Sequence, residues 1–242
     1  MPASSSKTVL QSLEWCKRFI FQRPTAMGNF LEPAVTSVNT VIQTMLGAPF
    51  RWRWNRQIVT FSTVIGQQDY TVPCNLGWIE NASVQWLDTN DSTLKWKEMA
   101  MKIDLALDSA SSRPHSISAQ ADDLNGNITF RLMPVPDQIY PISVTVQQKP
   151  VLVSSVNSTW TPIPDEYGHI YNWGLLALLY MYADDARFAV ANQKFVANLL
   201  AANQGLTETE RNIFLNDWQT ISGVMQTIPS TIQVGYKGRE SS

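Results

Sequence analysis

The sequence is poor in the side chains that most metal and redox sites need. Its 242 residues include only two histidines, His115 and His169, and two cysteines, Cys16 and Cys74. Two cysteines without regular spacing indicate free thiols rather than a disulfide scaffold. Glu166 and His169 have the spacing of half a carboxylate di-metal site, but the second Glu-x-x-His that such a site requires is missing. We therefore expect no metal and no cofactor.

The sequence also lacks the recognisable motifs of common enzymes. It contains no Walker A run, no dinucleotide-binding glycine pattern, no Gly-x-Ser-x-Gly and no His-Glu-x-x-His. Asp122 and Asp123 could form a carboxylate pair, yet adjacent residues of a strand point to opposite faces and would not flank one glycosidic bond. We therefore expect that the protein is not an enzyme. Turnover of peptidoglycan by the purified protein would be needed to support a hydrolase of cell-wall polymers.

Charged residues are scarce as well. They make up 16% of the chain, with a net charge of −2, whereas about a quarter is usual for a soluble domain. Proteins that bind duplex DNA tightly normally carry a stripe of basic residues, and no such stripe is visible in this sequence. The segment 51–56 alternates arginine and tryptophan as single-strand binders do, but we interpret Trp52 and Trp54 as covering an internal junction. The low charge predicts a surface that meets other proteins.

No apolar run is long enough to cross a membrane. The longest, from Trp173 to Tyr182, is short and interrupted, whereas a membrane-spanning helix needs about 20 apolar residues. We therefore expect no membrane partner.

Hydrophobic periodicity predicts helices towards both ends of the chain. Apolar residues recur there at spacings of three and four. Thr207 and Glu210 have the spacing of a capping box, in which the two side chains bind each other's free backbone N–H groups and start a helix. The predicted helices cover residues 7–21, 32–46, 166–183 and 187–203 and continue from Thr207, with a possible short helix over 101–108.

Between these helices the period changes towards two, which is typical of strands. Asn125-Gly126 is a strong hairpin signal, because glycine tolerates the positive φ of a tight turn. Strands at this spacing predict a sandwich or a small barrel. The predicted strands cover residues 57–65, 69–72, 79–87, 93–97, 115–120, 127–133 and 141–148.

These elements predict an α+β fold. We expect a helical bundle built from both chain ends, an inserted antiparallel β-sandwich or barrel module, and an extended C-terminal tail. The predicted domains are a ring-forming helical domain of residues 1–50 and 160–228, an inserted β domain of residues 51–159, and a docking tail of residues 229–242.

Three motifs follow one another along the chain. The first has Thr60, then Gly66-Gln67, Asp69-Tyr70 and Pro73, with Trp78-Ile79 after it. The second is the run from Phe130 to Pro136, with a strand and Lys149-Pro150 behind it. The third is the run from Trp160 to Asp165, which leads into a helix with Tyr171, Gly174 and Leu175. In order and spacing they resemble the phage head-to-tail connector proteins, the adaptor or tail tubular protein A-like group of podophages.

This resemblance implies a structural virion protein of the neck or tail, assembled in the host cytoplasm. Such proteins form a dodecameric ring below the portal protein, and packaged double-stranded DNA passes through the lumen without sequence-specific contact during ejection. The helical domain makes the ring, and the β module faces tail nozzle or fibre proteins. The candidate residues for that contact are Trp78, Trp86 and Trp96.

The resemblance also implies that the C-terminal tail docks on the portal. Apolar and polar residues alternate in the tail, so that it could add to a sheet as a strand or insert side chains into a groove. Simple disorder is the alternative. The candidate docking residues are Ile232, Val234, Tyr236, Lys237 and Arg239.

A second function of another class is a receptor- or glycan-binding module on an oligomeric helical base. Exposed tryptophans of the β module, again Trp78, Trp86 and Trp96, would then stack on sugars. Alanine at these positions distinguishes the two, since lost attachment with normal assembly favours glycan binding and failed assembly favours the adaptor.

Overall fold

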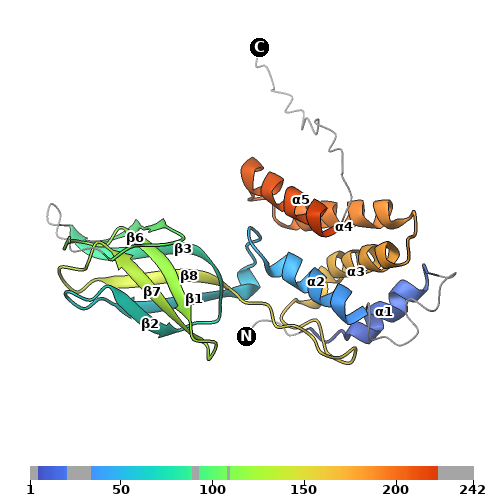
Figure 1. Cartoon of the computed structure of the whole chain (residues 1–242), viewed down its shortest axis with the longest axis horizontal. Coiled ribbons are helices and arrows are strands. Elements are labelled where there is room, and N and C mark those ends of the chain that lie inside the picture. The colour runs from blue at the N-terminus through green and yellow to red at the C-terminus, as the bar shows by residue number, and fades with distance from the viewer. Residues whose placement is uncertain (1–4, 21–33, 89–92, 108–109, 223–242) are drawn as a thin grey trace, which may run out of the picture.

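Strands and helices occupy opposite halves of an elongated molecule (Figure 1). The computed structural model describes residues 5–20, 34–88, 93–107 and 110–222. We call the strands and the loops between them the β part, and the α-helices with their connections the helical part. The helices of the helical part are α1 (Val9–Lys17), α2 (Ala34–Leu46), α3 (Gly168–Tyr182), α4 (Phe188–Ala202) and α5 (Glu208–Ser222).

The prediction of a helical bundle is wrong. The described residues form two four-stranded sheets and five α-helices, and the helices gather around α3 instead of sharing one bundle axis. Helix α3 contacts α1, α2 and α4 and buries residues on all its faces. A bundle helix has one apolar stripe. Because α3 is apolar all round, it becomes the centre of the group, and α5 lies at its margin with only Phe214, Trp218 and Ser222 buried.

Trp160 connects the core of the helical part to the segment that returns from the β part. Its ring stacks on Tyr171 of α3, with centroids 4.1 Å apart and 12° between the planes. Its Nε1 donates a hydrogen bond of 2.9 Å to Oγ of Ser12 in α1. All three side chains are buried. The stack fills the core, and the bond to Ser12 satisfies the buried indole N–H of Trp160.

The predicted capping box at Thr207 is confirmed. Oγ1 of Thr207 accepts from the backbone N–H of Glu210 at 3.2 Å, and the Glu210 carboxylate accepts from the backbone N–H of Thr207 at 2.9 Å. A second capping box, which the sequence analysis missed, joins Thr8 and Gln11 at the start of α1. Both boxes satisfy backbone donors that a helix start leaves free.

The β part is a sandwich. One sheet has the order β1-β8-β3-β4 and the other β2-β7-β6-β5. Neighbouring strands are antiparallel, apart from the parallel pair β5 and β6. All seven predicted strands are present, and β5 is an addition. The strands are β1 (Arg56–Ser62), β2 (Asp69–Pro73), β3 (Leu76–Asp88), β4 (Thr93–Glu98), β5 (Ala100–Met101), β6 (Ser116–Asp122), β7 (Asn127–Met133) and β8 (Pro141–Gln148).

Alternation of side chains explains the core between the sheets. In β7, Ile128, Phe130 and Leu132 are buried while the residues between them are partly exposed. In β8, Ile142 and Val144 alternate in the same way with serine and threonine. Successive residues of a strand point to opposite faces, so the apolar set of each sheet faces the other sheet and the polar set faces outward.

The prediction of a short helix over 101–108 is wrong. After Met101 the chain continues without regular structure, and the side chains of Ile103 and Leu107 are 99% and 76% exposed. The backbone carbonyl of Leu105 accepts a 3.0 Å bond from the Arg131 guanidinium, and that of Ala106 accepts from Gln68 Nε2. Side chains from other segments of the sandwich therefore bind carbonyl groups that a helix would have paired with its own N–H groups.

The Asn125-Gly126 turn ends the sandwich on the side of the helices. Gly126 has a φ of +88°, in the region that only glycine enters without strain. The Asp123 carboxylate accepts hydrogen bonds from the Asn127 side chain and from the backbone N–H groups of Asn127 and Asn125. These bonds lower the pKa of Asp123.

Among the described residues no helix is long and apolar enough to span a membrane.

Candidate interaction surfaces

The five predicted docking residues of the tail lie outside the described part of the chain, which ends at Ser222 of α5. Their role therefore stays a prediction. The residues are Ile232, Val234, Tyr236, Lys237 and Arg239.

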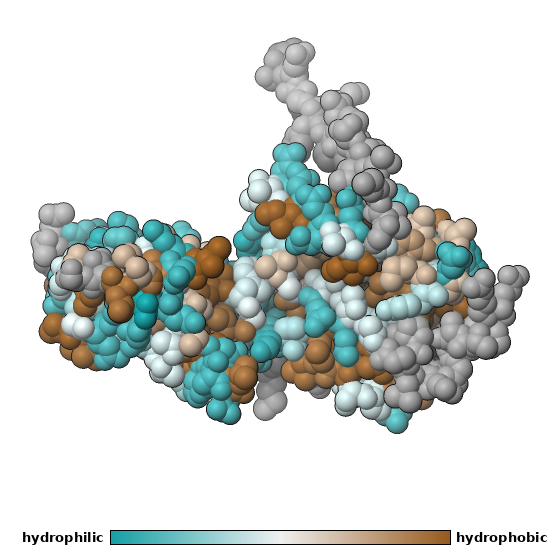
Figure 2. Space-filling view, viewed as in Figure 1, coloured by the Kyte–Doolittle hydropathy of each residue, from teal (hydrophilic) through white to brown (hydrophobic). Residues whose placement is uncertain are grey.

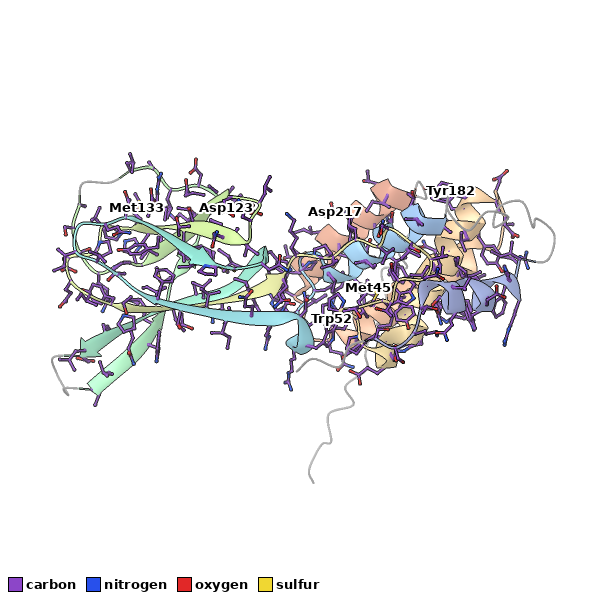
Figure 3. The ribbon with its side chains drawn as sticks, turned by 90° about the horizontal axis from the view of Figure 1, so that it is seen from below. Met45, Trp52, Asp123, Met133, Tyr182 and Asp217 are labelled. Carbon is purple, nitrogen blue, oxygen red and sulfur yellow. The ribbon has the colours of Figure 1, made fainter. Side chains whose placement is uncertain are left out.

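A buried glutamine joins the β part to the helical part. Gln147 of β8 accepts from the backbone N–H of Trp52 and donates to its carbonyl oxygen, both at 3.3 Å. The same Nε2 donates to the Glu80 carboxylate of β3 at 2.8 Å. Trp52 Nε1 donates to the backbone carbonyl of Met45 in α2 at 2.5 Å. The prediction that Trp52 covers an internal junction is confirmed, and Figure 3 shows it between the two parts.

Trp78 belongs to this junction rather than to a free surface. It is half-buried, and the Arg51 guanidinium lies 5.8 Å from the centroid of its ring. Arg51 also donates to the Glu210 carboxylate of α5 at 2.5 Å. This pairing, together with the capping bonds of Thr207, lowers the pKa of Glu210 to about 2. Trp78 is thereby held where the sandwich meets α5.

Trp86 is also covered by a cation. The Arg113 guanidinium lies 3.8 Å from the centroid of its ring, and the other side of Trp86 packs against the sandwich core. A guanidinium over a tryptophan face is a favourable cation–π contact. An arginine distant in sequence lies over the ring of each of these two tryptophans, so at least one face of each ring is already in contact with the protein.

Trp96 is the exposed member of the three. It lies on the edge strand β4 with 52% of its surface exposed, opposite Gln85 of β3. Leu87 and Leu94 form the next pair on the same face and are also exposed. The structure thus places two predicted contact residues under arginines and one in an apolar row on a hairpin.

A second apolar surface, which the sequence analysis missed, lies at the end of the sandwich far from the helices. We call Val64, Ile65, Leu107 and Ile139 the distal tip; all four side chains are more than half exposed. Bonds join their loops, from Gly66 N–H to the Pro136 carbonyl and from Thr63 Oγ1 to the Gln138 carbonyl, both 2.9 Å long. Figure 2 shows brown, apolar residues at this end, and in Figure 3 Met133, the last residue of β7, lies there.

The loops of the distal tip are firmly held. The Tyr70 hydroxyl donates to the Gln67 carbonyl at 2.7 Å and accepts from the Val64 N–H at 3.0 Å, and burial raises its pKa. Arg131 donates two bonds to the Asp69 carboxylate, at 2.7 and 2.8 Å, which lowers the pKa of Asp69. A preformed apolar surface loses little conformational freedom when a partner covers it. Its only sequence signal is Val64-Ile65 immediately before the Gly66 turn, where polar residues are usual.

Comparison with known families shows which class of protein the chain belongs to. A family model described as SU10 adaptor protein matches residues 20–220, which is most of the chain. The chain belongs to the SU10 adaptor protein family. No curated protein matches it. The resemblance to phage adaptors is thereby confirmed at the level of the family.

Membership makes the chain a phage adaptor, a structural protein of the virion neck that joins portal and tail proteins. The role is non-enzymatic. No group of three or more histidine, cysteine, aspartate or glutamate residues that could hold a metal ion occurs in the described ranges.

The helical part of the adaptor has a shallow groove between α2 and α5. Its volume is about 200 Å³, and Phe214, Trp218 and Ile221 of α5 face Thr40 and Thr44 of α2 across it. Ile221 is half exposed and lies one residue before the end of α5. The groove is thus a mixed apolar and hydroxyl surface next to the C-terminal end of α5.

Proposed function

We propose that this adaptor forms a homo-oligomeric ring, dodecameric as in the tail tubular protein A-like adaptors of podophages, between portal and tail. The ring leaves a lumen through which double-stranded DNA passes during ejection. The observation that carries the proposal is the firmly held distal tip, whose four apolar side chains are exposed at the end of the sandwich far from the helices. Exposed apolar patches of this kind mark sites of protein contact.

The two parts have different tasks in this proposal. Residues 1–50 and 160–228 form the ring, residues 51–159 face the tail nozzle or fibres, and residues 229–242 dock on the portal. The distal tip and Ser222, the last residue of α5, lie in different halves of the molecule. Portal and tail proteins can therefore be bound at the same time without competing for one surface.

The charge of the chain supports a lumen that does not retain DNA. Its 18 basic residues are balanced by 20 acidic ones, whereas tight binding of duplex DNA depends on many cation–phosphate contacts. Packaged DNA then passes without sequence-specific contact.

The glycan-binding alternative has less support. Stacking on a sugar requires an open aromatic face, and arginines cover Trp78 and Trp86. Trp96 alone of the three is more than half exposed.

The test is the mass of the purified adaptor in solution, measured by light scattering alone and after mixing with portal rings. The proposal predicts a twelvefold ring of adaptor on each portal. Deletion of residues 229–242 should abolish this binding while the far-ultraviolet circular dichroism stays unchanged. An adaptor that ignores the portal, or a truncated chain that still joins DNA-filled heads, would contradict the proposed docking.

A further inference from the structure

The first sheet of the sandwich has two outer strands. In the order β1-β8-β3-β4, strands β1 and β4 each have one neighbour in the sheet. Every residue of β4 is exposed, and in β1 the exposed positions include Ile58, at 67%. Outer strands that present backbone groups and apolar side chains are templates for pairing with another strand.

Two hydrogen bonds show which backbone groups face outward. The Thr63 N–H binds the Tyr140 carbonyl at 2.9 Å, in register with β1 and β8. Directly bonded and non-bonded pairs alternate along an antiparallel ladder. Val59 and Phe61 therefore bond to β8, and the backbone groups of Ile58 and Thr60 point away from the sheet.

The same reasoning applies to β4. The Met99 N–H binds the Ala82 carbonyl at 2.8 Å, in register with β3 and β4. Lys97 therefore bonds to β3, and the backbone groups of Leu94, Trp96 and Glu98 point away. On both outer strands, the residues with outward backbone groups carry their side chains on the outer face of the sandwich.

The strand directions allow a second copy to continue the sheet. β1 is antiparallel to β8, β8 to β3, and β3 to β4, so β1 and β4 of one chain run in opposite directions. A neighbour placed by rotation in a ring presents its β1 antiparallel to the first copy's β4. Such a head-to-tail contact generates a closed ring when the rotations between successive copies add up to a full turn.

We propose that β4 of each copy pairs with β1 of its neighbour, so that the outer sheets of adjacent sandwiches join. The proposal rests on the ring described above and names the contact between its β parts. In the matching register Ile58 lies opposite Trp96, Thr60 opposite Leu94 and Arg56 opposite Glu98 of the other copy.

Side-chain chemistry selects this register. It sets an apolar residue against the half-exposed tryptophan and a cation against an anion, and both kinds of cross-strand pair are favourable. Arg56 already donates to Glu80 within its own chain, and the remaining N–H groups of a guanidinium can donate to a second carboxylate. A shift of two residues in one direction sets Ile58 against Glu98. A shift in the other direction sets Ile58 against Leu94 and Arg56 against Trp96, but it moves Glu98 beyond the start of β1 and so removes the cation opposite it.

The test is a disulfide between copies in portal-bound adaptor and in assembled particles. The variant Ile58→Cys with Trp96→Cys should give a ladder of covalent oligomers on mild oxidation. The two positions cannot close within one chain, because three strand spacings separate them by about 14 Å, whereas a disulfide needs Cα atoms within about 7 Å. The native thiols Cys16 and Cys74 are buried.

The matched control is Ile58→Cys with Lys97→Cys, which moves one cysteine to the opposite face of β4, and it should give no ladder. Each single variant should stay monomeric on oxidation, because its cysteine faces Trp96 or Ile58 of the neighbouring copy and not a second cysteine. If the Ile58→Cys, Trp96→Cys ring forms on portals with normal mass and yet no ladder appears, the pairing is wrong while the proposed function stands. If no ring forms even with the unmodified chain, the proposed function is wrong as well.

Discussion

The two parts of the adaptor use their large apolar residues differently. In the helical part Trp160, Trp218 and almost the whole of α3 are buried, and the polar atoms of the two tryptophans are satisfied inside. In the β part the core is narrow, and Ile65, Trp96 and other apolar residues remain exposed on outer strands and loops. The buried set stabilises the chain, and we propose that the exposed set of the β part serves contacts with other proteins.

The largest effect is expected in the helical part. Trp218→Ala should lower the free energy of unfolding by about 3–5 kcal/mol, because it leaves a cavity and removes the 2.7 Å bond to Asn192 Oδ1. Trp96→Ala is the matched control in the β part and should cost less than about 1 kcal/mol, the range of surface changes. Denaturant unfolding measures both. Equal losses of unfolding free energy in the two variants would show that Trp96 stabilises the chain as much as Trp218 does.

The junction should give the next largest effect. Gln147→Ala leaves the Trp52 backbone groups and one Glu80 bond without a buried partner, which should cost about 1–3 kcal/mol. Because Gln147 links the two parts, calorimetry should also resolve two unfolding transitions in the variant. Gln85→Ala, on the outer face of the same sandwich, is the control. A single unshifted transition in Gln147→Ala would show that the parts are coupled by other contacts.

A smaller, pH-dependent effect is expected at Glu210. Its pKa in the folded protein is lowered to about 2 by Arg51 and Thr207, so its stabilisation is present above the ordinary value of 4.5 and disappears as the pH falls through about 2. Glu210→Gln should cost about 1 kcal/mol at neutral pH, since the pair is partly exposed. Unfolding curves of both proteins should converge between pH 4.5 and 2. A constant difference across this range would contradict the assignment.

The smallest effect on stability, with the largest on assembly, is expected at the distal tip. Ile65→Asp should change the free energy of unfolding by about 0.5 kcal/mol or less, because the side chain is exposed. It should still block attachment of tail proteins to portal-bound adaptor, since a charge would be desolvated in the contact. Leu124→Asp is the control, at an exposed site on the opposite end of the sandwich. Normal tail attachment by Ile65→Asp would exclude the tip as the tail contact.

Local structure was largely predictable from the sequence. The period of apolar residues located the strands, and Thr207 with Glu210 marked the start of α5. The arrangement of the helices was not predictable in the same way, because periodicity shows that α3 is apolar without showing how many neighbours surround it.

The candidate surfaces were less predictable than the fold. Nothing near Trp78 or Trp86 in the sequence shows that Arg51 and Arg113 cover them, since these contacts arise only when distant strands and loops meet. The distal tip likewise combines residues from three separate loops. Trp96 was named together with Trp78 and Trp86, and nothing in that prediction distinguished the exposed tryptophan from the two that contact arginines.

The central claim is that the distal tip binds the tail and does not contribute to the portal contact. Hydroxyl-radical footprinting of the adaptor on portal rings, before and after tail proteins are added, tests it most directly. The account predicts that Ile65, Leu107 and Ile139 are oxidised at equal rates in the free and portal-bound adaptor and become protected only when the tail is attached. Protection on portal binding alone, or continued oxidation after tail attachment, would contradict it.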